Sequence, residues 1–258
     1  NSRLGFLSLR LQTKNNTTMG RAFEFRKERK MKRWAGMAKT FTRIGREIAI
    51  AVKSGGGDPA YNPSLRLAVQ NAKTANMPKQ NVENAIKKAT SKDAENFQEV
   101  IYEGYGPNKV AFVVETATDN PTRTIATVRM HFNRNGGEIV ESGTHNFIFD
   151  RKGVIKINSE GQDLEELELL LIDYGLESIV QEDEDIMITV AFSDYGTMLK
   201  GLEEQNIEIL SAEAVRLPTV VKNVAEDHLE AIIKLIDKLE EEDDITNVFH
   251  NMDMSEES

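Results

Sequence analysis

The sequence contains no cysteine, which excludes disulfides, thiol catalysis and cysteine-ligated zinc. It also lacks any apolar run close to the roughly 20 residues that a membrane-spanning helix needs, so we expect no membrane contact. A chain without cysteine suits a reducing cytosol, and we expect a cytoplasmic protein. The 258 residues are 40% hydrophobic and 29% charged, which is typical of a globular protein with two or three compact units.

Residue patterns that would indicate catalysis or metal binding are sparse as well. The four histidines lack the spacing of a metal site, and no Gly-x-Ser-x-Gly, Gly-x-Gly-x-x-Gly or paired catalytic carboxylates stand out. Two acidic runs, residues 182–185 and 240–244, lack the ligand spacing of a calcium loop and are typical of solvated charge. We therefore predict that the protein is not an enzyme and holds no metal or cofactor.

Each half of the chain is poor in charge of one sign. Residues 1–95 hold 20 Lys and Arg against 7 Asp and Glu, a balance of +13, whereas residues 96–258 hold 12 against 35, a balance of −23. Solvated helices alone carry charge, but so uneven a distribution favours an electrostatic footprint for nucleic acid. We expect a basic N-terminal unit on an acidic body.

Helical periodicity extends over residues 20–52. At about 100° per residue, the second half of this segment has one apolar stripe. The stripe comprises Trp34, Met37, Phe41, Ile44, Ile48 and Ala51. The opposite stripe carries Lys39, Arg43, Arg46 and Lys53, and we predict that these cations face outward. The preceding residues 25–33, FRKERKMKR, extend the row of cations and favour an element that follows nucleic-acid phosphates.

Glycine and proline divide residues 53–89 into a loop and two short helical patterns. Gly55-Gly56-Gly57-Asp58-Pro59 ends the long helix. Since no Lys-Ser or Lys-Thr follows the last glycine, the pattern favours an interhelix turn over a phosphate-binding P-loop. Ser64 is predicted to cap the second helix, and Pro78 to open the third. Four lysines on these helices are left for solvent or ligand: Lys73, Lys79, Lys87 and Lys88.

Beyond residue 97 the apolar spacing changes to that of strands mixed with helices. Residues 110–118 have the length and β-branched content of a buried strand. Asn120 and Pro121 begin a helix, and a helix over residues 227–239 with a short strand after it closes the chain. These outer segments can form one α/β unit that is interrupted by another.

The interrupting unit has a recognisable order of elements. Residues 147–149 and 154–157 are predicted to be two strands joined by a hairpin turn at Asp150-Arg151-Lys152-Gly153. From residue 154 to 216 the order is strand, helix, strand, strand, helix, strand. This is the ferredoxin-like split βαβ arrangement.

We therefore predict an α+β fold, with a basic three-helix N-terminal domain followed by two ferredoxin-like α/β domains, one inserted in the other. The predicted domains are residues 19–95, the basic helices; residues 96–141 with 215–258, the discontinuous α/β domain; and residues 142–214, the inserted domain. Residues 1–18 lack acidic side chains and precede Met19. They are either an organelle-targeting remnant or an extension upstream of a start at Met19, and we predict that they are unstructured or non-native.

Ordered motifs from residue 20 onward resemble a known family. They are Gly55-Gly56-Gly57-Asp58-Pro59, Asn62-Pro63 with Leu65-Arg66, Ala72-Lys73, Asn76-Met77-Pro78-Lys79, Ile86-Lys87-Lys88, Tyr102-Glu103-Gly104-Tyr105-Gly106-Pro107, Thr118-Asp119-Asn120, Arg123-Thr124, Asn135-Gly136-Gly137, Phe149-Asp150-Arg151-Lys152-Gly153 and Val248-Phe249-His250-Asn251. The chain resembles the YebC/PmpR family, which includes the mitochondrial translational activator of cytochrome oxidase subunit one. The resemblance implies a basic helical first domain followed by two α/β domains.

The resemblance also implies a role in gene expression, for which the family carries two descriptions. Bacterial members are described as DNA-binding transcriptional regulators, whereas the organellar relative and some bacterial ones look like ribosome-associated translation factors. The sequence departs from the family near its start, where Phe23 replaces a tryptophan and Glu28 a histidine within Lys27-Glu28-Arg29-Lys30. The cations are kept, but the indole and imidazole are lost.

We expect a nucleic-acid-binding regulator of gene expression, whose helical domain grips the phosphate backbone of DNA or ribosomal RNA. No helix with well-spaced base-reading residues stands out, which favours readout of shape or backbone. The predicted contact residues are Arg26, Lys27, Arg29, Lys30, Lys32, Arg33, Lys39, Arg43, Arg46, Lys53, Arg66, Lys73, Lys79, Lys87 and Lys88. The alternatives are a translation factor that binds the ribosome through its RNA, and a protein-interaction scaffold that does not bind nucleic acid directly.

Overall fold

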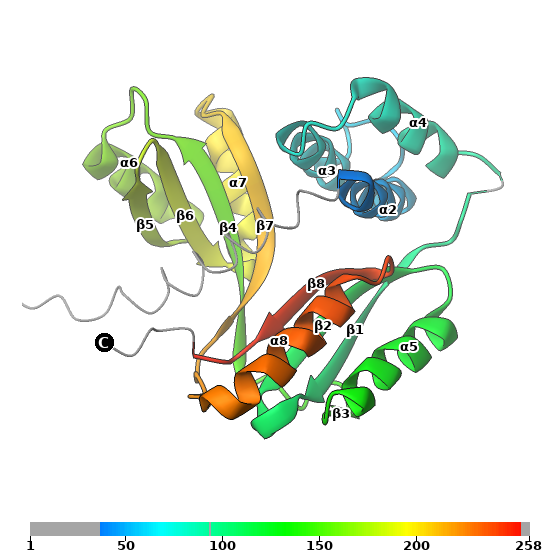
Figure 1. The fold of residues 1–258 in the computed structure, drawn as a ribbon. Helices are drawn as coiled ribbons and strands as arrows, with labels where there is room; N and C mark the ends of the chain where they lie inside the picture. Colours follow the sequence, from blue (N-terminus) through cyan, green and yellow to red (C-terminus); the bar gives the residue numbers. More distant parts are fainter. Residues whose placement is uncertain (1–36, 93, 254–258) are drawn as a thin grey trace, which may run out of the picture.

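The computed structural model describes residues 37–92 and 94–253 (Figure 1). Within these ranges the chain forms three helices and then two four-stranded antiparallel sheets with further helices. The predicted α+β fold class is confirmed. The extension 1–18 and the basic arm 25–33 lie outside the described residues. In the described ranges, no helix combines the length and apolar character that a membrane crossing requires.

The N-terminal helices pack through one shared core. They are α2 (Met37–Gly55), α3 (Pro63–Thr74) and α4 (Lys79–Ala89), and α2 contacts both of the others. The buried core side chains are Ile44, Ile48, Ala51, Val52, Leu65, Ala68, Ala72 and Val82. Ile44, Ile48 and Ala51 belong to the predicted apolar stripe, so this part of the stripe faces the core. The alanines on α3 allow the helices to approach closely.

Asn62 caps α3, so the cap predicted at Ser64 is wrong. The Asn62 side-chain oxygen accepts a hydrogen bond from the backbone N–H of Leu65 at 3.1 Å. Its amide nitrogen donates to the carbonyl oxygens of Ala51 at 2.7 Å and Gly56 at 2.8 Å. A serine hydroxyl has one donor hydrogen and cannot donate to two carbonyls, whereas the buried Asn62 amide does so and joins the end of α2 and the glycine loop to α3.

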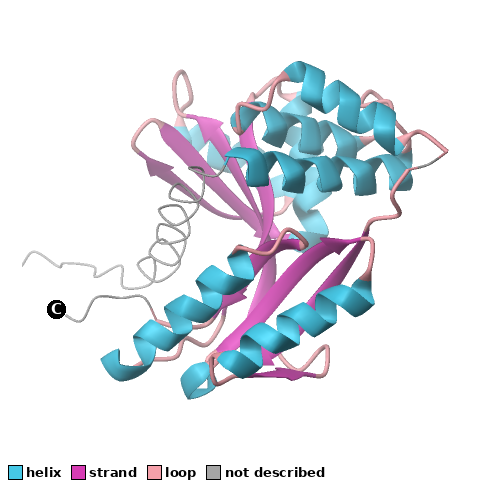
Figure 2. Cartoon of the chain, turned by 45° about the vertical axis from the view of Figure 1, so that its right-hand side comes forward, coloured by secondary structure: helices cyan, strands magenta, loops and turns pink. Residues whose placement is uncertain are grey.

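The first sheet has the strand order β3-β1-β2-β8, and every neighbouring pair is antiparallel. Its strands are β1 (Gln98–Tyr105), β2 (Ala111–Thr118), β3 (Glu138–Val140) and β8 (Ile245–His250). Helices α5 (Pro121–Arg134) and α8 (Glu226–Glu240) contact each other beside this sheet (Figure 2). The sequence did not predict β1, because its burial is irregular along the strand and does not produce a clear two-residue alternation.

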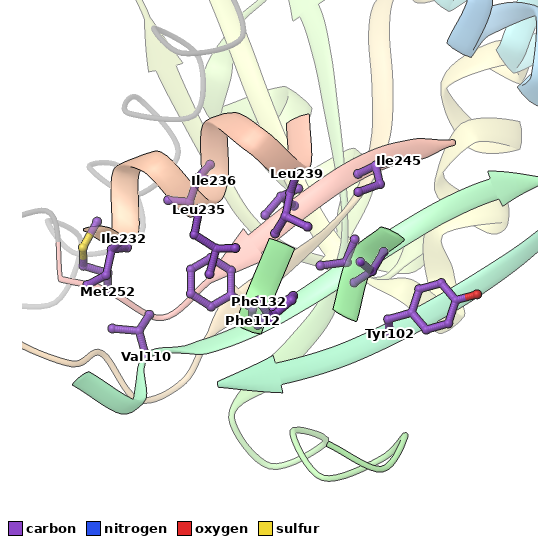
Figure 3. Packing of buried hydrophobic residues seen from close by; sticks show 13 residues of the cluster. Tyr102, Val110, Phe112, Phe132, Ile232, Leu235, Ile236, Leu239, Ile245 and Met252 are labelled. Carbon is purple, nitrogen blue, oxygen red and sulfur yellow. The ribbon is translucent and has the colours of Figure 1, made fainter. Parts of the chain in front are cut away.

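The core between this sheet and its helices is aromatic at its centre (Figure 3). The rings of Phe112 on β2 and Phe132 on α5 meet almost perpendicularly, with centroids 5.7 Å apart. Leu235 and Leu239 of α8 are fully buried in the same cluster. Edge-to-face packing of this kind stabilises a pair of rings by about 0.5–1.5 kcal/mol beyond the area they bury. The two helices and the sheet therefore form one unit although α8 follows α5 by almost one hundred residues.

The second sheet has the strand order β5-β6-β4-β7 and is antiparallel throughout. Its strands are β4 (Phe149–Asn158), β5 (Leu176–Glu182), β6 (Asp185–Ala191) and β7 (Ile209–Pro218), with α6 (Leu164–Leu171) and α7 (Tyr195–Glu204) as its helices. This is the ferredoxin-like order of a split βαβ unit. The chain forms three strands of the first sheet, then the whole second sheet, and returns to the first with α8 and β8.

The hairpin turn predicted at residues 150–153 is wrong, because these residues lie inside the continuous strand β4. They pair on one side with β7, and residues 152–153 pair with β6 on the other side. Gly153 serves close packing instead of a turn, since a Cβ at this position would lie 2.2 Å from Cδ2 of the Tyr195 ring. Pairing with two neighbouring strands outweighs the local turn preference of the sequence.

The two sheets are joined by a small core of their own. Ala111, Val113 and Phe249 of the first sheet belong to one buried cluster with residues of β4 and β7, among them Phe149 and Leu217. Across the same junction Arg216 Nε donates to Glu115 Oε1 at 2.8 Å, and both side chains are largely buried. The sheets therefore contact each other through apolar packing and a charged hydrogen bond.

Helix α3 lies along β7, which is an edge strand of the second sheet (Figure 1). The side-chain amide of Asn71 donates to the carbonyl oxygen of Ala212 at 3.0 Å and accepts from its N–H at 3.4 Å. Gln70 Nε2 donates to the carbonyl oxygen of Ile209 at 2.6 Å, and Leu67 packs against the core of the second sheet. The amides of α3 thus satisfy backbone groups of an edge strand that would otherwise be open to pairing.

Candidate nucleic-acid interface

The described part of the helical domain is strongly basic. Residues 37–92 hold ten Lys and Arg against three Asp and Glu, a balance of +7. Seven of the ten cations are exposed: Lys53, Arg66, Lys73, Lys79, Lys87, Lys88 and Lys92. Six of these were predicted from the sequence as contact residues, whereas Lys92 was not.

Lysines gather where α2 and α4 end. The Lys53 amine, at the end of α2, donates to Asn96 Oδ1. The Lys88 amine, at the end of α4, donates to Glu95 Oε1 at 2.8 Å. Because the two amines reach adjacent residues of the chain, the two helix ends lie next to each other. Cations also stabilise helix C-termini, so this placement favours folding as well as an external anion.

The exposed cations are weakly engaged within the protein. Arg66 lies 3.6 Å from a Glu203 carboxylate oxygen, with side chains 43% and 57% exposed, and Lys79 lies 3.7 Å from Glu83 on the same helix. Exposed pairs of this kind contribute about 0–1 kcal/mol. An incoming phosphate can therefore replace the carboxylate partner at little cost in stability.

Arg43 and Arg46 do not face outward, and this part of the sequence prediction is wrong. They point to the acidic turn, which we define as residues 240–244 between α8 and β8. Arg43 Nη2 donates to the carbonyl oxygen of Glu240 at 2.9 Å. Arg46 Nη1 donates to the carbonyl oxygen of Asp243 at 2.5 Å and to Asp244 Oδ1 at 2.8 Å. The cationic stripe of α2 is therefore covered by the acidic run that the sequence indicated as solvated charge.

Lys39 shares this environment. Its side chain is half-buried, and burial together with the neighbouring charge of Arg43 lowers the pKa of its amine below the ordinary value. The charges of Asp243 and Glu242 act in the opposite direction but do not cancel the shift. Lys39 and Arg43, one turn apart on α2, therefore repel each other, and additional negative charge nearby would relieve this repulsion.

Asp244 is the centre of the acidic turn. Its Oδ2 accepts hydrogen bonds from Arg123 Nη2 at 2.8 Å and from Thr124 Oγ1 at 2.7 Å, while Oδ1 pairs with Arg46. Burial alone would raise the pKa of this carboxyl, but the hydrogen bonds from Arg123 and Thr124 and the charge of Arg46 outweigh it and lower the pKa. Asp244 is therefore a stable carboxylate that links α2 to the start of α5.

A partly open cavity of about 320 Å³ borders this contact. Arg46 and Arg123 line it together with Thr127 and most of the acidic turn. Solvent and ions can reach the guanidinium of Arg46 from this side. Sequence spacing did not reveal the cavity, because its lining comes from α2, α5 and the turn before β8, which are far apart along the chain.

Six of the predicted contact residues lie outside the described residues and stay predictions. They are Arg26, Lys27, Arg29, Lys30, Lys32 and Arg33. Of the other nine, six form the exposed set on α2, α3 and α4, and three line the contact with the acidic turn. The structure therefore separates the predicted cations into an accessible group and a covered group.

Together, the fold and the charge distribution define a class of protein: a basic three-helix domain that rests on two joined antiparallel sheets. Two family models match this chain, the TACO1/YebC protein N-terminal domain over residues 21–92 and the TACO1/YebC second and third domain over residues 97–252. The chain therefore belongs to the TACO1/YebC family, and the resemblance seen in the sequence motifs is confirmed.

Relatives and a solved structure match over most of this length. A protein of Parabacteroides distasonis is 52% identical over 242 residues, covering 93% of this chain and 100% of its own. One of Porphyromonas gingivalis is 53% identical, covering 91% and 97%. Both are named probable transcriptional regulatory proteins. The crystal structure of the conserved hypothetical protein Aq1575 from Aquifex aeolicus is similar with a TM-score of 0.72 at 37% identity, over 85% of this chain and 91% of that one.

Proposed function

We propose that the protein is a nucleic-acid-binding regulator of transcription that holds the phosphate backbone of DNA with the exposed cations of its helical domain. One observation carries this proposal. Seven Lys and Arg side chains are exposed on residues 37–92, whose charges sum to +7, although the net charge of the whole chain is −10. The names of the relatives support the regulatory role. The exposed pairs at Arg66 and Lys79 are weak enough to exchange carboxylate for phosphate.

Contacts to phosphate would give affinity without base readout. Lysine provides a flexible point charge that does not depend on sequence, and five of the six predicted exposed contacts are lysines. Binding of this kind releases counterions, so the logarithm of the association constant falls linearly with the logarithm of the salt concentration. Each phosphate contact to duplex DNA contributes about 0.9 to the slope.

The test is a salt titration with a fluorescent 20-base-pair DNA duplex, read by anisotropy. The variant carries Lys79→Gln, Lys87→Gln and Lys88→Gln on α4, where all three side chains are exposed. If each lysine contacts a phosphate, the slope falls by about 2.7 in magnitude, which is three times the value for one contact. An unchanged slope and affinity would contradict a role for α4.

A matched control removes three exposed lysines outside the helical domain instead, one in the turn before β2 and two on helices α7 and α8: Lys109→Gln, Lys200→Gln and Lys234→Gln. It changes the net charge equally, so only general attraction of the duplex should weaken. Equal losses in the two triple variants would mean that the helical domain is not the binding face. An RNA duplex of the same sequence separates the alternatives, since clear preference for RNA would favour the ribosome-associated function over DNA.

A further inference from the structure

The helical domain is attached to the sheets by two contacts of different chemistry. Helix α3 meets β7 through the neutral amides of Gln70 and Asn71 and the apolar side chain of Leu67. Helix α2 meets the acidic turn through the guanidinium groups of Arg43 and Arg46. A polyanion competes with carboxylates and not with apolar packing, so the second contact is more sensitive to it than the first, where the ionic element is the exposed pair of Arg66 and Glu203.

The acidic turn offers Arg43 and Arg46 oxygen acceptors, as a phosphate backbone would. They are one carboxylate oxygen of Asp244 and two backbone carbonyls, at 2.5–2.9 Å, and Arg46 also donates to the carbonyl oxygen of Ala117 on β2 at 3.1 Å. The carbonyl of Glu240 is at the C-terminus of α8, where the helix dipole adds partial negative charge. Guanidinium groups bind phosphate with the same forked geometry that they use for carboxylates.

We propose that the acidic turn occupies a phosphate-binding site on α2, and that nucleic acid held by the helical domain separates α2 from the turn, with the domain tilting about the α3–β7 contact while the turn stays on α5. This inference rests on the proposed function. In the closed form the turn covers Arg43 and Arg46, and in the open form both arginines bind the phosphodiester backbone beside the exposed lysines. The contact is then an internal competitor that lowers the affinity for nucleic acid.

The surroundings favour such an exchange. Lys39 and Arg43 lie one turn apart on α2, and burial together with the charge of Arg43 lowers the pKa of the Lys39 amine, so this pair gains from a ligand that brings more negative charge than the acidic turn can. The cavity of about 320 Å³ beside Arg46 brings solvent to the edge of the contact, so dissolved salt can weaken its ionic part there.

Opening can be followed by energy transfer between two dyes. Because the natural chain has no cysteine, Asn84→Cys on α4 and Ala126→Cys on α5 give two unique labelling sites, and both positions are exposed. Transfer should fall as the 20-base-pair DNA duplex is added, with the same midpoint as duplex anisotropy. Raising sodium chloride without duplex should also lower it, since the contact is ionic.

A charge reversal in the turn tests the competition. Asp243 is exposed and near Lys39, so Asp243→Lys repels α2 without changing the buried hydrogen bonds of Asp244. The matched control is Glu230→Lys, an equal charge change at an exposed position on α8. Asp243→Lys should start in the low-transfer state and bind the duplex about threefold tighter than the control, because it replaces an attractive charge near Lys39 by a repulsive one.

The outcomes separate the two proposals. If the duplex binds but transfer stays constant and the two lysine variants bind equally, the separation of α2 from the acidic turn is refuted while the proposed function stands. If no form of the protein binds the duplex, the proposed function fails, and this inference fails with it. The folding of Asp243→Lys is checked by circular dichroism and a melting curve. If both match those of the unsubstituted chain, unchanged duplex binding cannot be attributed to unfolding.

Discussion

Replacing Asn71 by alanine should loosen the helical domain from the second sheet. The Asn71 side chain satisfies both backbone groups of Ala212, at 3.0 and 3.4 Å, on the open side of edge strand β7. A net hydrogen bond contributes about 0.5–1.5 kcal/mol, so two of them contribute about 2 kcal/mol to docking. A loss of 2 kcal/mol raises the population of the undocked form about thirtyfold.

Hydrogen exchange at the Ala212 amide measures this change directly, because Asn71 is the acceptor of that N–H. In Asn71→Ala the exchange rate of this amide should rise about thirtyfold, the factor that corresponds to about 2 kcal/mol. The core amides of β6 should be unaffected, since they belong to the sheet itself. Asn84→Ala on the exposed face of α4 is the control and should leave Ala212 unchanged. Equal exchange at Ala212 in the natural chain and in Asn71→Ala would refute the role of α3 as an edge cover.

Two further changes test the packing of the second sheet and the charge of the acidic turn. Gly153→Ala would place a Cβ 2.2 Å from the Tyr195 ring and should cost about 1–3 kcal/mol in urea unfolding. Gly196→Ala, which has open space at its Cβ, should leave the free energy of unfolding unchanged or raise it by up to about 1 kcal/mol. Equal effects of the two substitutions would contradict the close packing of Gly153 against Tyr195. The pKa of Asp244 is lowered in the folded protein, so its stabilisation is present above about pH 4 and is lost as pH falls through the folded-state pKa. Asp244→Asn should therefore lower the melting temperature at pH 7 and remove this acid-dependent loss, and a parallel fall in both proteins would contradict it.

Local patterns predicted the elements well where one periodicity dominates. The apolar stripe of α2, the start of α5 at Asn120 and the ferredoxin-like order of the second sheet all follow from neighbouring residues. The hairpin at residues 150–153 failed because strand pairing, which is not local, outweighs turn preference. Strand β1 contains a glycine and has an irregular burial pattern, so its alternation is too weak to be read from sequence alone.

Arg43 and Arg46 show that the site, like the strands, depends on contacts that local sequence patterns do not reveal. A helix face opposite an apolar stripe looks solvent-exposed when only its own domain is considered. Arg43 and Arg46 bind partners 197 or 198 positions away, and no spacing rule connects residues so distant. The complementary signs were visible, a cationic stripe and an acidic run at residues 240–244, but the other acidic run, residues 182–185, could equally have been the partner.

The long pairing of β4 with β7 has a mechanical consequence. Both crossings of the chain between the sheets run through this one ribbon, whose pairing extends from Phe149 with Pro218 to Ile157 with Ile209. The end of the ribbon at Phe149 and Leu217 packs in the small core with Phe249, and further along the ribbon Ala212 of β7 contacts α3. A rotation of the second sheet about its junction with the first sheet would therefore move the helical domain with it.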